Sequence, residues 1–218
     1  MNTLDLVIFD LDGTLVDTAP DIAAALAATL AEVAVPPPPL PVVKGLVGDG
    51  ARALIARALA REGVERDVEP LLPRFLAHYA DHLCVASRLY PGVGEALTAL
   101  RGAGVAAAVV TNKPGDLARG LLAQLGIGAG FVAIIGDGDG FPRKPDPEGA
   151  RSITAAVGAS VERTAVVGDG LPDVRLARAL GARAIAAGWG YVDQDRLRAE
   201  SPDALADTPA EAARLLLG

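Results

Sequence analysis

The chain has 218 residues, which is enough for one large domain or for a core with a smaller insertion. Hydrophobic residues make up 51% of the sequence but aromatic residues only 4%, so aliphatic side chains must fill the core. A formal net charge of −7 argues against nucleic acid as a partner, and the single cysteine, Cys84, excludes a disulfide within the chain.

The N-terminal residues carry no basic segment of the kind that opens a signal peptide. The sequence also has no run of 18 or more uncharged apolar residues, so we expect no membrane partner. A lone cysteine favours a reducing compartment, and we therefore expect a cytoplasmic location.

The first predicted element is a buried strand over residues 6–9, because four apolar residues in a row precede a turn. This apolar run ends at two carboxylates, Asp10 and Asp12. A buried strand end has no structural use for two acids, since each costs several kcal/mol to desolvate without compensation. Open α/β sheets bind ligands at the carboxyl ends of their strands, so we expect a metal-assisted site here rather than a helix cap.

Residues 18–88 show helical periodicity and no legible strand. Apolar residues recur at helical spacing over 22–33, 51–59 and 68–83, and the prolines at 36–39 end the first of these helices. We therefore expect a separate helical unit inserted directly after the first strand.

From residue 90 onward, predicted strands alternate with helices. The strands are expected over 105–110, 131–135, 164–167 and 184–187, with a last helix over 209–217. Such alternation is typical of a parallel sheet that helices cover on both faces. We predict an α/β fold in which residues 1–16 and 89–218 form a doubly wound parallel sheet and residues 17–88 form an all-helical cap.

Polar side chains follow three of the predicted strands, and one lysine between prolines precedes a helix. These candidates are Asp10, Asp12, Thr111, Asn112, Lys144, Asp169 and Asp173. The carboxyl ends of parallel strands lie along one edge, so the candidates can converge. Four carboxylates in one pocket need more positive charge than one lysine supplies. An all-oxygen ligand set suits Mg²⁺, which we expect as the cofactor, and the His and Cys clusters of a zinc site are absent from the sequence.

These motifs resemble those of the haloacid-dehalogenase-like (HAD) phosphatases. Residues 10–17 are similar to the first motif of that superfamily, Thr111 with Asn112 to the second, Lys144 with its prolines to the third, and residues 168–173 to the fourth. The two-acid first motif belongs to phosphatases and phosphomutases, whereas dehalogenases carry a single acid there. The resemblance implies a HAD-like core with a helical cap after the first strand.

The resemblance also implies a role for each candidate. Asp10 would attack phosphorus to form an aspartyl-phosphate, and Asp12 would act as acid and then as base. Asp10, Asp169 and the backbone carbonyl of Asp12 would ligate Mg²⁺, while Asp173 would hold a metal-bound water or orient the other ligands. The donors to the phosphoryl oxygens would be Thr111, Asn112 and Lys144.

Further stretches resemble the phosphoglycolate phosphatase branch of the superfamily, namely residues 14–22, 89–93 and 111–114. Residues 44–52 resemble the substrate-facing loop of that branch. From this loop we expect contacts to the substrate by Lys44, Asp49, Gly50 and Arg52. The resemblance thus implies hydrolysis of a small phosphorylated substrate, above all 2-phosphoglycolate. Asp49 departs from the Asn that is common in relatives, and its negative charge puts the substrate in question.

Two alternatives stay open. A sugar-phosphate mutase shares all four core motifs, although the Arg-x-x-Ser arrangement usual in its cap is absent here. A catalytically silent scaffold would belong to a different functional class, and the intact set of motifs argues against it. The sequence is compatible with either a monomer or a homodimer.

Overall fold

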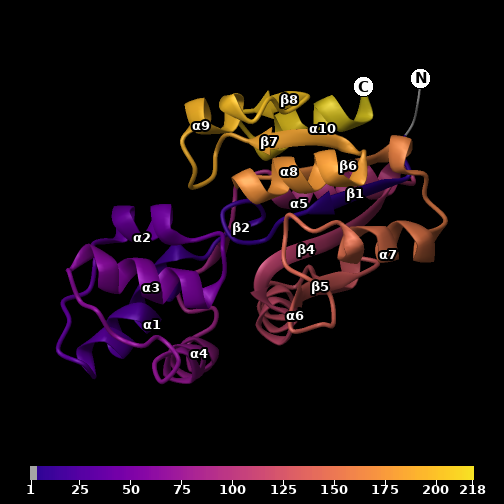
Figure 1. Ribbon diagram of the computed structural model, residues 1–218. Helices are drawn as coiled ribbons and strands as arrows, with labels where there is room; N and C mark the ends of the chain where they lie inside the picture. Colours follow the sequence, from indigo (N-terminus) through magenta and orange to yellow (C-terminus); the bar gives the residue numbers. More distant parts are fainter. Residues whose placement is uncertain (1–3) are drawn as a thin grey trace.

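A computed structural model describes residues 4–218 and contains a six-stranded sheet with the order β5-β4-β1-β6-β7-β8 (Figure 1). Every pairing within this sheet is parallel, and β1 lies between β4 and β6. The prediction of a doubly wound α/β fold is confirmed. The strands of the sheet are β1 Leu6–Phe9, β4 Ala106–Pro114, β5 Ile134–Asp137, β6 Thr164–Gly168, β7 Arg183–Ala187 and β8 Ala204–Ala206.

Helices cover both faces of the sheet because successive residues of a strand point to opposite sides. Leu6 and Ile8 of β1 belong to one buried cluster, and Val7 and Phe9 belong to the other. The first cluster includes residues of α7 Glu148–Val157, α8 Leu171–Leu180 and α9 Gln194–Ala199. The second includes residues of α5 Val93–Gly102, α6 Gly115–Gln124 and α10 Pro209–Leu217.

A helical segment, residues 19–81, lies beside the sheet rather than on either face (Figure 1). Its four helices are α1 Ala19–Ala31, α2 Leu40–Leu46, α3 Ala51–Arg61 and α4 Leu72–Asp81. Two short strands, β2 Val16–Asp17 and β3 Arg88–Leu89, pair antiparallel where the chain enters and leaves this segment. The boundaries proposed for a core and a cap, after residues 16 and 88, stay predictions.

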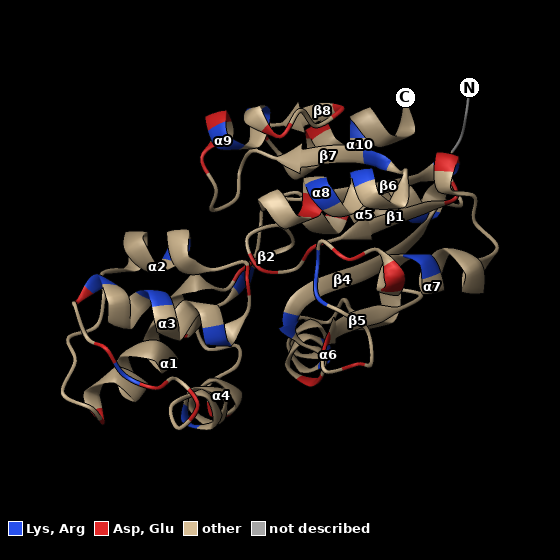
Figure 2. Cartoon of the chain, viewed as in Figure 1, with Lys and Arg blue, Asp and Glu red and all other residues tan. Residues whose placement is uncertain are grey.

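A buried carboxylate at the start of α1, Asp21, also joins the chain entering the helical segment to the chain leaving it. Asp21 accepts hydrogen bonds from Ser87 N at 2.7 Å, Ser87 Oγ at 2.6 Å and Ala86 N at 2.9 Å. Figure 2 shows that acidic residues also occur along the loops where the helical segment meets the sheet. The carboxyl edge of the sheet therefore faces the helical segment across an acidic junction.

Several elements differ from the sequence-based expectations. Residues 44–52 resemble a loop in sequence, but Lys44 lies in α2 and only residues 47–50 connect α2 to α3. Arg52 lies in α3, in agreement with the helix predicted over 51–59. The strand expected over 131–135 begins later and includes Gly136 and Asp137. Helices α2 and α9 and strands β2, β3 and β8 were not predicted. No helix among residues 4–218 combines the length and apolar character needed to cross a membrane.

Candidate active site

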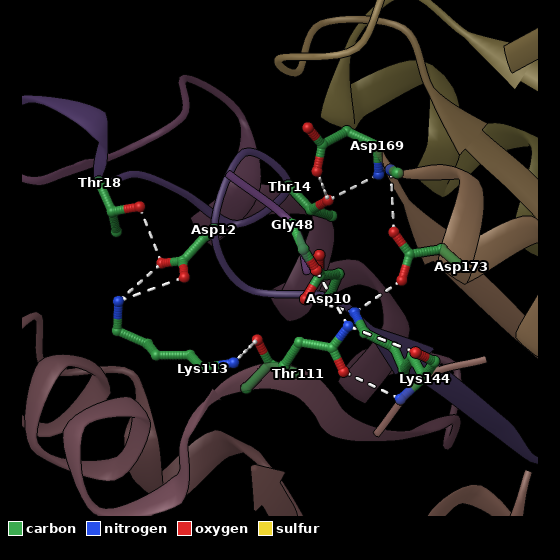
Figure 3. A network of polar contacts seen from close by, with 12 residues as sticks. Asp10, Asp12, Thr14, Thr18, Gly48, Thr111, Lys113, Lys144, Asp169 and Asp173 are labelled. Carbon is green, nitrogen blue, oxygen red and sulfur yellow. Dashed lines mark hydrogen bonds and ion pairs between the residues drawn. The ribbon is translucent and has the colours of Figure 1, made fainter. Parts of the chain in front are cut away.

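Asp10 and Asp12 lie directly after the central strand. Asp10 N donates to Val167 O of β6 at 2.9 Å, so the parallel pairing continues one residue beyond β1. Gly13 then turns the chain with a φ of +87°, and the Asp169 carboxylate fills the space that a side chain at this position would need. The turn keeps both acids at the carboxyl edge of the sheet (Figure 3).

Three buried carboxylates converge at this edge: Asp10 follows β1, Asp169 follows β6, and Asp173 lies in the first turn of α8. One oxygen atom each of Asp10, Asp169 and Asp173 lies within 4.8 Å of the other two. Thr14 Oγ1 donates to Asp169 Oδ1 at 2.8 Å, and Tyr191 N donates to Asp169 Oδ2 at 2.7 Å. Burial, together with the nearby Asp10 carboxylate, raises the pKa of Asp169 to about 8.

Lys144 is the cation of this cluster. Its Nζ lies 2.6 Å from Asp10 Oδ1 and 2.7 Å from Asp173 Oδ1, and its side chain is 2% exposed. Burial alone would lower the pKa of Lys144, but the two carboxylates outweigh it and hold that pKa above its ordinary value. Burial raises the pKa of Asp10 to about 6 even though Lys144 opposes the effect. One lysine therefore does not balance the acidic charge.

The donor set fits a hard divalent cation such as Mg²⁺. Asp10 Oδ1 is close enough to Lys144 for an ion pair, yet it accepts no well-aligned hydrogen bond. A buried carboxylate oxygen that accepts no aligned hydrogen bond, beside a second carboxylate with a raised pKa, is an arrangement that a cation would stabilise. Asp10, Asp169 and Asp173 are the residues that could hold it.

The second motif positions Lys144 and links it to the helical segment. Asn112 Oδ1 accepts a hydrogen bond from Lys144 N at 2.9 Å, and Asn112 Nδ2 donates to Gly48 O at 3.0 Å. The Thr111 hydroxyl accepts a hydrogen bond from Lys113 N at 3.2 Å (Figure 3). Thr111 and Asn112 are both buried, and both line the cavity above Asp10.

A second polar group surrounds Asp12. Lys113 Nζ donates to Asp12 Oδ1 at 3.0 Å and Oδ2 at 3.2 Å, and Thr18 Oγ1 donates to Asp12 Oδ1 at 2.8 Å (Figure 3). Lys113 Nζ also donates to Tyr79 Oη at 2.6 Å. Burial by itself lowers the pKa of Lys113, but Asp12 and Tyr79 outweigh it, so this pKa is raised.

A cavity separates the carboxyl edge of the sheet from the helical segment. The sheet side contributes Asp10, Asp12 and the second motif, and the helical segment contributes mainly apolar side chains. The residues of the helical segment that line it are Ile22, Val47, Gly48, Gly50, Ala51, Leu54, Phe75, Leu76 and Tyr79. A smaller adjoining cavity reaches Lys144, Asp169 and Asp173. The helical segment thus forms one wall of the cavity that leads to Asp10.

The predicted substrate contacts divide into two groups. Gly50 lines the larger cavity, whereas neither cavity is lined by Lys44, Asp49 or Arg52. Lys44 Nζ pairs with Asp17 at 3.1 Å, and Asp49 and Arg52 pair with other charged residues of the helical segment on its exposed surface. A contact between these three residues and a substrate stays a prediction.

Sequence analysis missed four residues that hold the site together. Lys113, Thr14 and Thr18 contact the two acidic groups, and their signal was present because all three lie in or beside the quoted motifs. Tyr191 donates through its backbone to Asp169 and through its hydroxyl to Asp17 at 2.8 Å. It follows β7 in a loop without a recognised motif, so no sequence signal pointed to it.

Comparisons with known proteins agree with this geometry. The family model for haloacid dehalogenase-like hydrolases matches residues 4–181. A phosphoglycolate phosphatase of Agrobacterium fabrum (strain C58) is 48% identical over 145 residues, which cover 65% of this chain and 62% of that protein. The N-acetylmuramic acid 6-phosphate phosphatase of Pseudomonas aeruginosa is 40% identical over 145 residues, which cover 66% of this chain and 64% of that protein.

The chain spans less than two thirds of the length of these curated relatives. Over nearly its whole length it is similar to a solved structure described as a predicted phosphoglycolate phosphatase from Haemophilus somnus 129PT. That similarity has a TM-score of 0.90 at 29% identity and covers 99% of this chain and 98% of the other. With the family match reaching across all four motifs, the chain belongs to the haloacid dehalogenase-like hydrolases.

Proposed function

We propose that the chain catalyses Mg²⁺-dependent hydrolysis of a small phosphate monoester, with 2-phosphoglycolate as the first candidate substrate. The observation that carries this proposal is the convergence of Asp10, Asp169 and Asp173 beside Lys144 at the end of the central strand. Open parallel sheets bind ligands at this edge, and Asp10 Oδ1, which is ion-paired with Lys144, accepts no aligned hydrogen bond there.

In this proposal Asp10, Asp169 and Asp173, with the backbone carbonyl of Asp12, would hold Mg²⁺. When bound, the ion would neutralise both the carboxylates and the phosphoryl oxygens. Lys144, Thr111 and Asn112 surround the same end of the sheet, where they would bind the remaining phosphoryl oxygens.

Two steps would complete the reaction. A carboxylate oxygen of Asp10 attacks phosphorus and forms an aspartyl-phosphate, while the bond to the leaving oxygen breaks and Asp12 gives that oxygen a proton. A water molecule then attacks the same phosphorus, its proton passes to Asp12, and the bond between Asp10 and phosphorus breaks to release phosphate. Asp12 ends protonated, ready for the next leaving group.

The helical segment would determine which substrates fit the cavity. Its apolar residues form most of the far wall of the cavity, so a leaving group must fit between this wall and Asp12. Relatives named for phosphoglycolate and for N-acetylmuramic acid 6-phosphate both support a small phosphorylated substrate. A cytoplasmic monomer or homodimer would be the working form.

The decisive experiment measures initial rates of phosphate release from a panel of esters with Mg²⁺ and, in parallel, with a chelator. The panel includes 2-phosphoglycolate, N-acetylmuramic acid 6-phosphate, a hexose phosphate and an aryl phosphate. We expect phosphate release with Mg²⁺ and none with the chelator. Conversion of a sugar phosphate to an isomer without phosphate release would favour a mutase, and silence across the panel would favour a scaffold. Full turnover with the chelator would refute the metal assignment.

A further inference from the structure

Lys113 is a buried lysine to which the proposed mechanism gives no task. It lies near the end of β4, and its side chain is 3% exposed. Its ammonium group has three N–H donors, and the structure gives it three acceptors: both oxygens of Asp12 and the hydroxyl of Tyr79. Although Lys113 lines the larger cavity, its three donors are all engaged, so we expect it to act on the reaction through these neighbours.

Asp12 is held from two sides by residues on different elements. Lys113 reaches both of its oxygens from β4, and Thr18 reaches Oδ1 from the connection before α1. A carboxylate that accepts three hydrogen bonds at 2.8 to 3.2 Å from two side chains is fixed in orientation as well as in place. Proton transfer requires such positioning, since a displacement of about 1 Å can cost about 100-fold in rate.

Tyr79 extends this contact into the helical segment. It is a buried residue of α4, its hydroxyl lies 2.6 Å from Lys113 Nζ, and Lys113 Nζ lies 4.3 Å from the centre of its ring. Phe75, one turn earlier in α4, stacks on the Tyr79 ring at 6.0 Å between ring centres. The position of Lys113 therefore depends on α4 as well as on the sheet.

We propose that Lys113 is a positioning residue for Asp12, held in turn by Tyr79, so that α4 of the helical segment fixes the proton-transfer group of the sheet. This inference rests on the proposed function. A buried ion pair is weak evidence for a purely structural role, because replacing such a pair with apolar residues of similar volume is often neutral or stabilising. Lys113 instead lies where its loss changes the orientation of Asp12 and leaves Asp10 untouched.

The test compares an alkyl ester, 2-phosphoglycolate, with an aryl ester, p-nitrophenyl phosphate, in the full-length chain with Mg²⁺. The aryl leaving group needs little protonation, so a defect in Asp12 should slow the alkyl ester more. We expect Lys113→Met to lower kcat for the alkyl ester about 10- to 100-fold. The fold-decrease in kcat for the aryl ester should be several times smaller. Lys113→Arg should recover part of the alkyl rate, because it keeps the charge next to Asp12.

A double-mutant cycle isolates the route through Asp12. In an Asp12→Asn background, Lys113→Met should hardly change the ratio of kcat between the alkyl and aryl esters. The effects of two residues that act as a unit are not additive. Arg119→Met is the matched control, because it also removes one positive charge. Arg119 lies on α6, where it is exposed and forms an ion pair with Asp139. This control should leave both rates within about twofold of wild type.

Tyr79→Phe keeps the ring and removes only the acceptor for Lys113, so it also serves if Lys113→Met does not fold, as judged by circular dichroism and Tm. Tyr79→Phe should lower kcat less than Lys113→Met does, and it should again slow the alkyl ester more than the aryl ester. Equal losses on both esters, or an undiminished effect of Lys113→Met in the Asp12→Asn background, would overturn the inference while the proposed function stands. A folded wild-type chain that releases phosphate from no ester would overturn both.

Discussion

The ion pairs at the carboxyl edge of the sheet and those on the surface of the helical segment differ in burial. At the sheet edge, Lys113 and Lys144 are buried and contact carboxylates that are themselves almost inaccessible. On the helical segment, Arg52 pairs with Glu69 at the surface, where about half of each side chain is exposed. Charges at the sheet edge therefore interact in a low dielectric, whereas water can replace the partners of an exposed pair.

The helical segment contributes to the cavity in another manner. Leu54, Phe75 and Leu76 supply apolar surface, Gly48 supplies a carbonyl for Asn112, and Tyr79 supplies an acceptor for a lysine of the sheet. Apart from the contact of Tyr79 with Lys113, we therefore expect the reaction itself to depend on the sheet edge and the choice of substrate to depend on the helical segment. The predictions below test this division.

The largest effect is expected at Asp10. Asp10→Asn removes the nucleophile and one metal ligand together, so turnover should fall to background on aryl and alkyl esters alike. Mass spectrometry of acid-quenched samples should detect a phosphoryl adduct on the wild-type chain and none on the variant. Substantial turnover by a folded Asp10→Asn variant would refute the role of Asp10 as nucleophile.

Asp12→Asn should have the next largest effect, and one that depends on the leaving group. The amide keeps the shape and backbone carbonyl of Asp12 but can neither give nor take the proton. General acid–base catalysis is worth about 10²- to 10⁴-fold, so we expect a loss of this size on an alkyl ester and a smaller one on an aryl ester. The same loss on both esters, measured as initial phosphate release, would show that Asp12 does not protonate the leaving group.

The sheet edge is also the region that sequence analysis predicted well. Asp10, Thr111 and Asp169 each follow an apolar run long enough to identify a strand, and parallel topology brings all strand ends to one edge. The position of these residues therefore follows from local pattern and topology alone. The pairing of Asp12 with Lys113 does not, because it depends on side-chain directions at the end of β4.

The helical segment was predicted less well for a physical reason. Helix α2 contains Pro41, Gly45 and two valines, so its intrinsic helix propensity is low and packing must stabilise it. Without α2, Lys44 is assigned to a loop that leads directly into the helix of Arg52. Strand β8 and helix α9 were missed because three and six residues give too little periodicity to recognise.

A third prediction concerns stability in the absence of metal. The pKa of Asp169 is about 8 in the folded chain against 3.8 for an unperturbed group, so folding favours its protonated form. The contribution of Asp169 to the free energy of unfolding should therefore be fully present below pH 4 and should be lost as the pH rises towards 8. Asp169→Asn removes this charge, and its amide can still accept from Tyr191 N and donate to Thr14 Oγ1.

We thus expect Asp169→Asn to raise the Tm of the metal-free protein at pH 8 by a few degrees and to change it little at pH 4. Mg²⁺ should raise the Tm of the wild-type chain and should have a smaller effect on the variant, because binding to the folded state stabilises it. Scanning calorimetry with a chelator and with Mg²⁺ measures both effects. A lower Tm for the variant at pH 8 would contradict the view that the cluster carries excess negative charge.

The smallest effects are expected from Lys44→Met and Arg52→Met, which remove the same charge from neighbouring helices. Lys44 Nζ contacts Asp17 at 3.1 Å and lies 5.3 Å from the ring centre of Tyr191, whereas Arg52 pairs at the exposed surface. We expect Lys44→Met to shift the ratio of kcat/KM between 2-phosphoglycolate and a neutral sugar phosphate about two- to fivefold, the size of a partly exposed ion pair. Arg52→Met should shift it by less than about twofold. Because both variants change the net charge equally, a larger shift for Arg52→Met would contradict this ranking. An equal loss on every ester in Lys44→Met would instead assign Lys44 to the chemistry and weaken the division between the two regions.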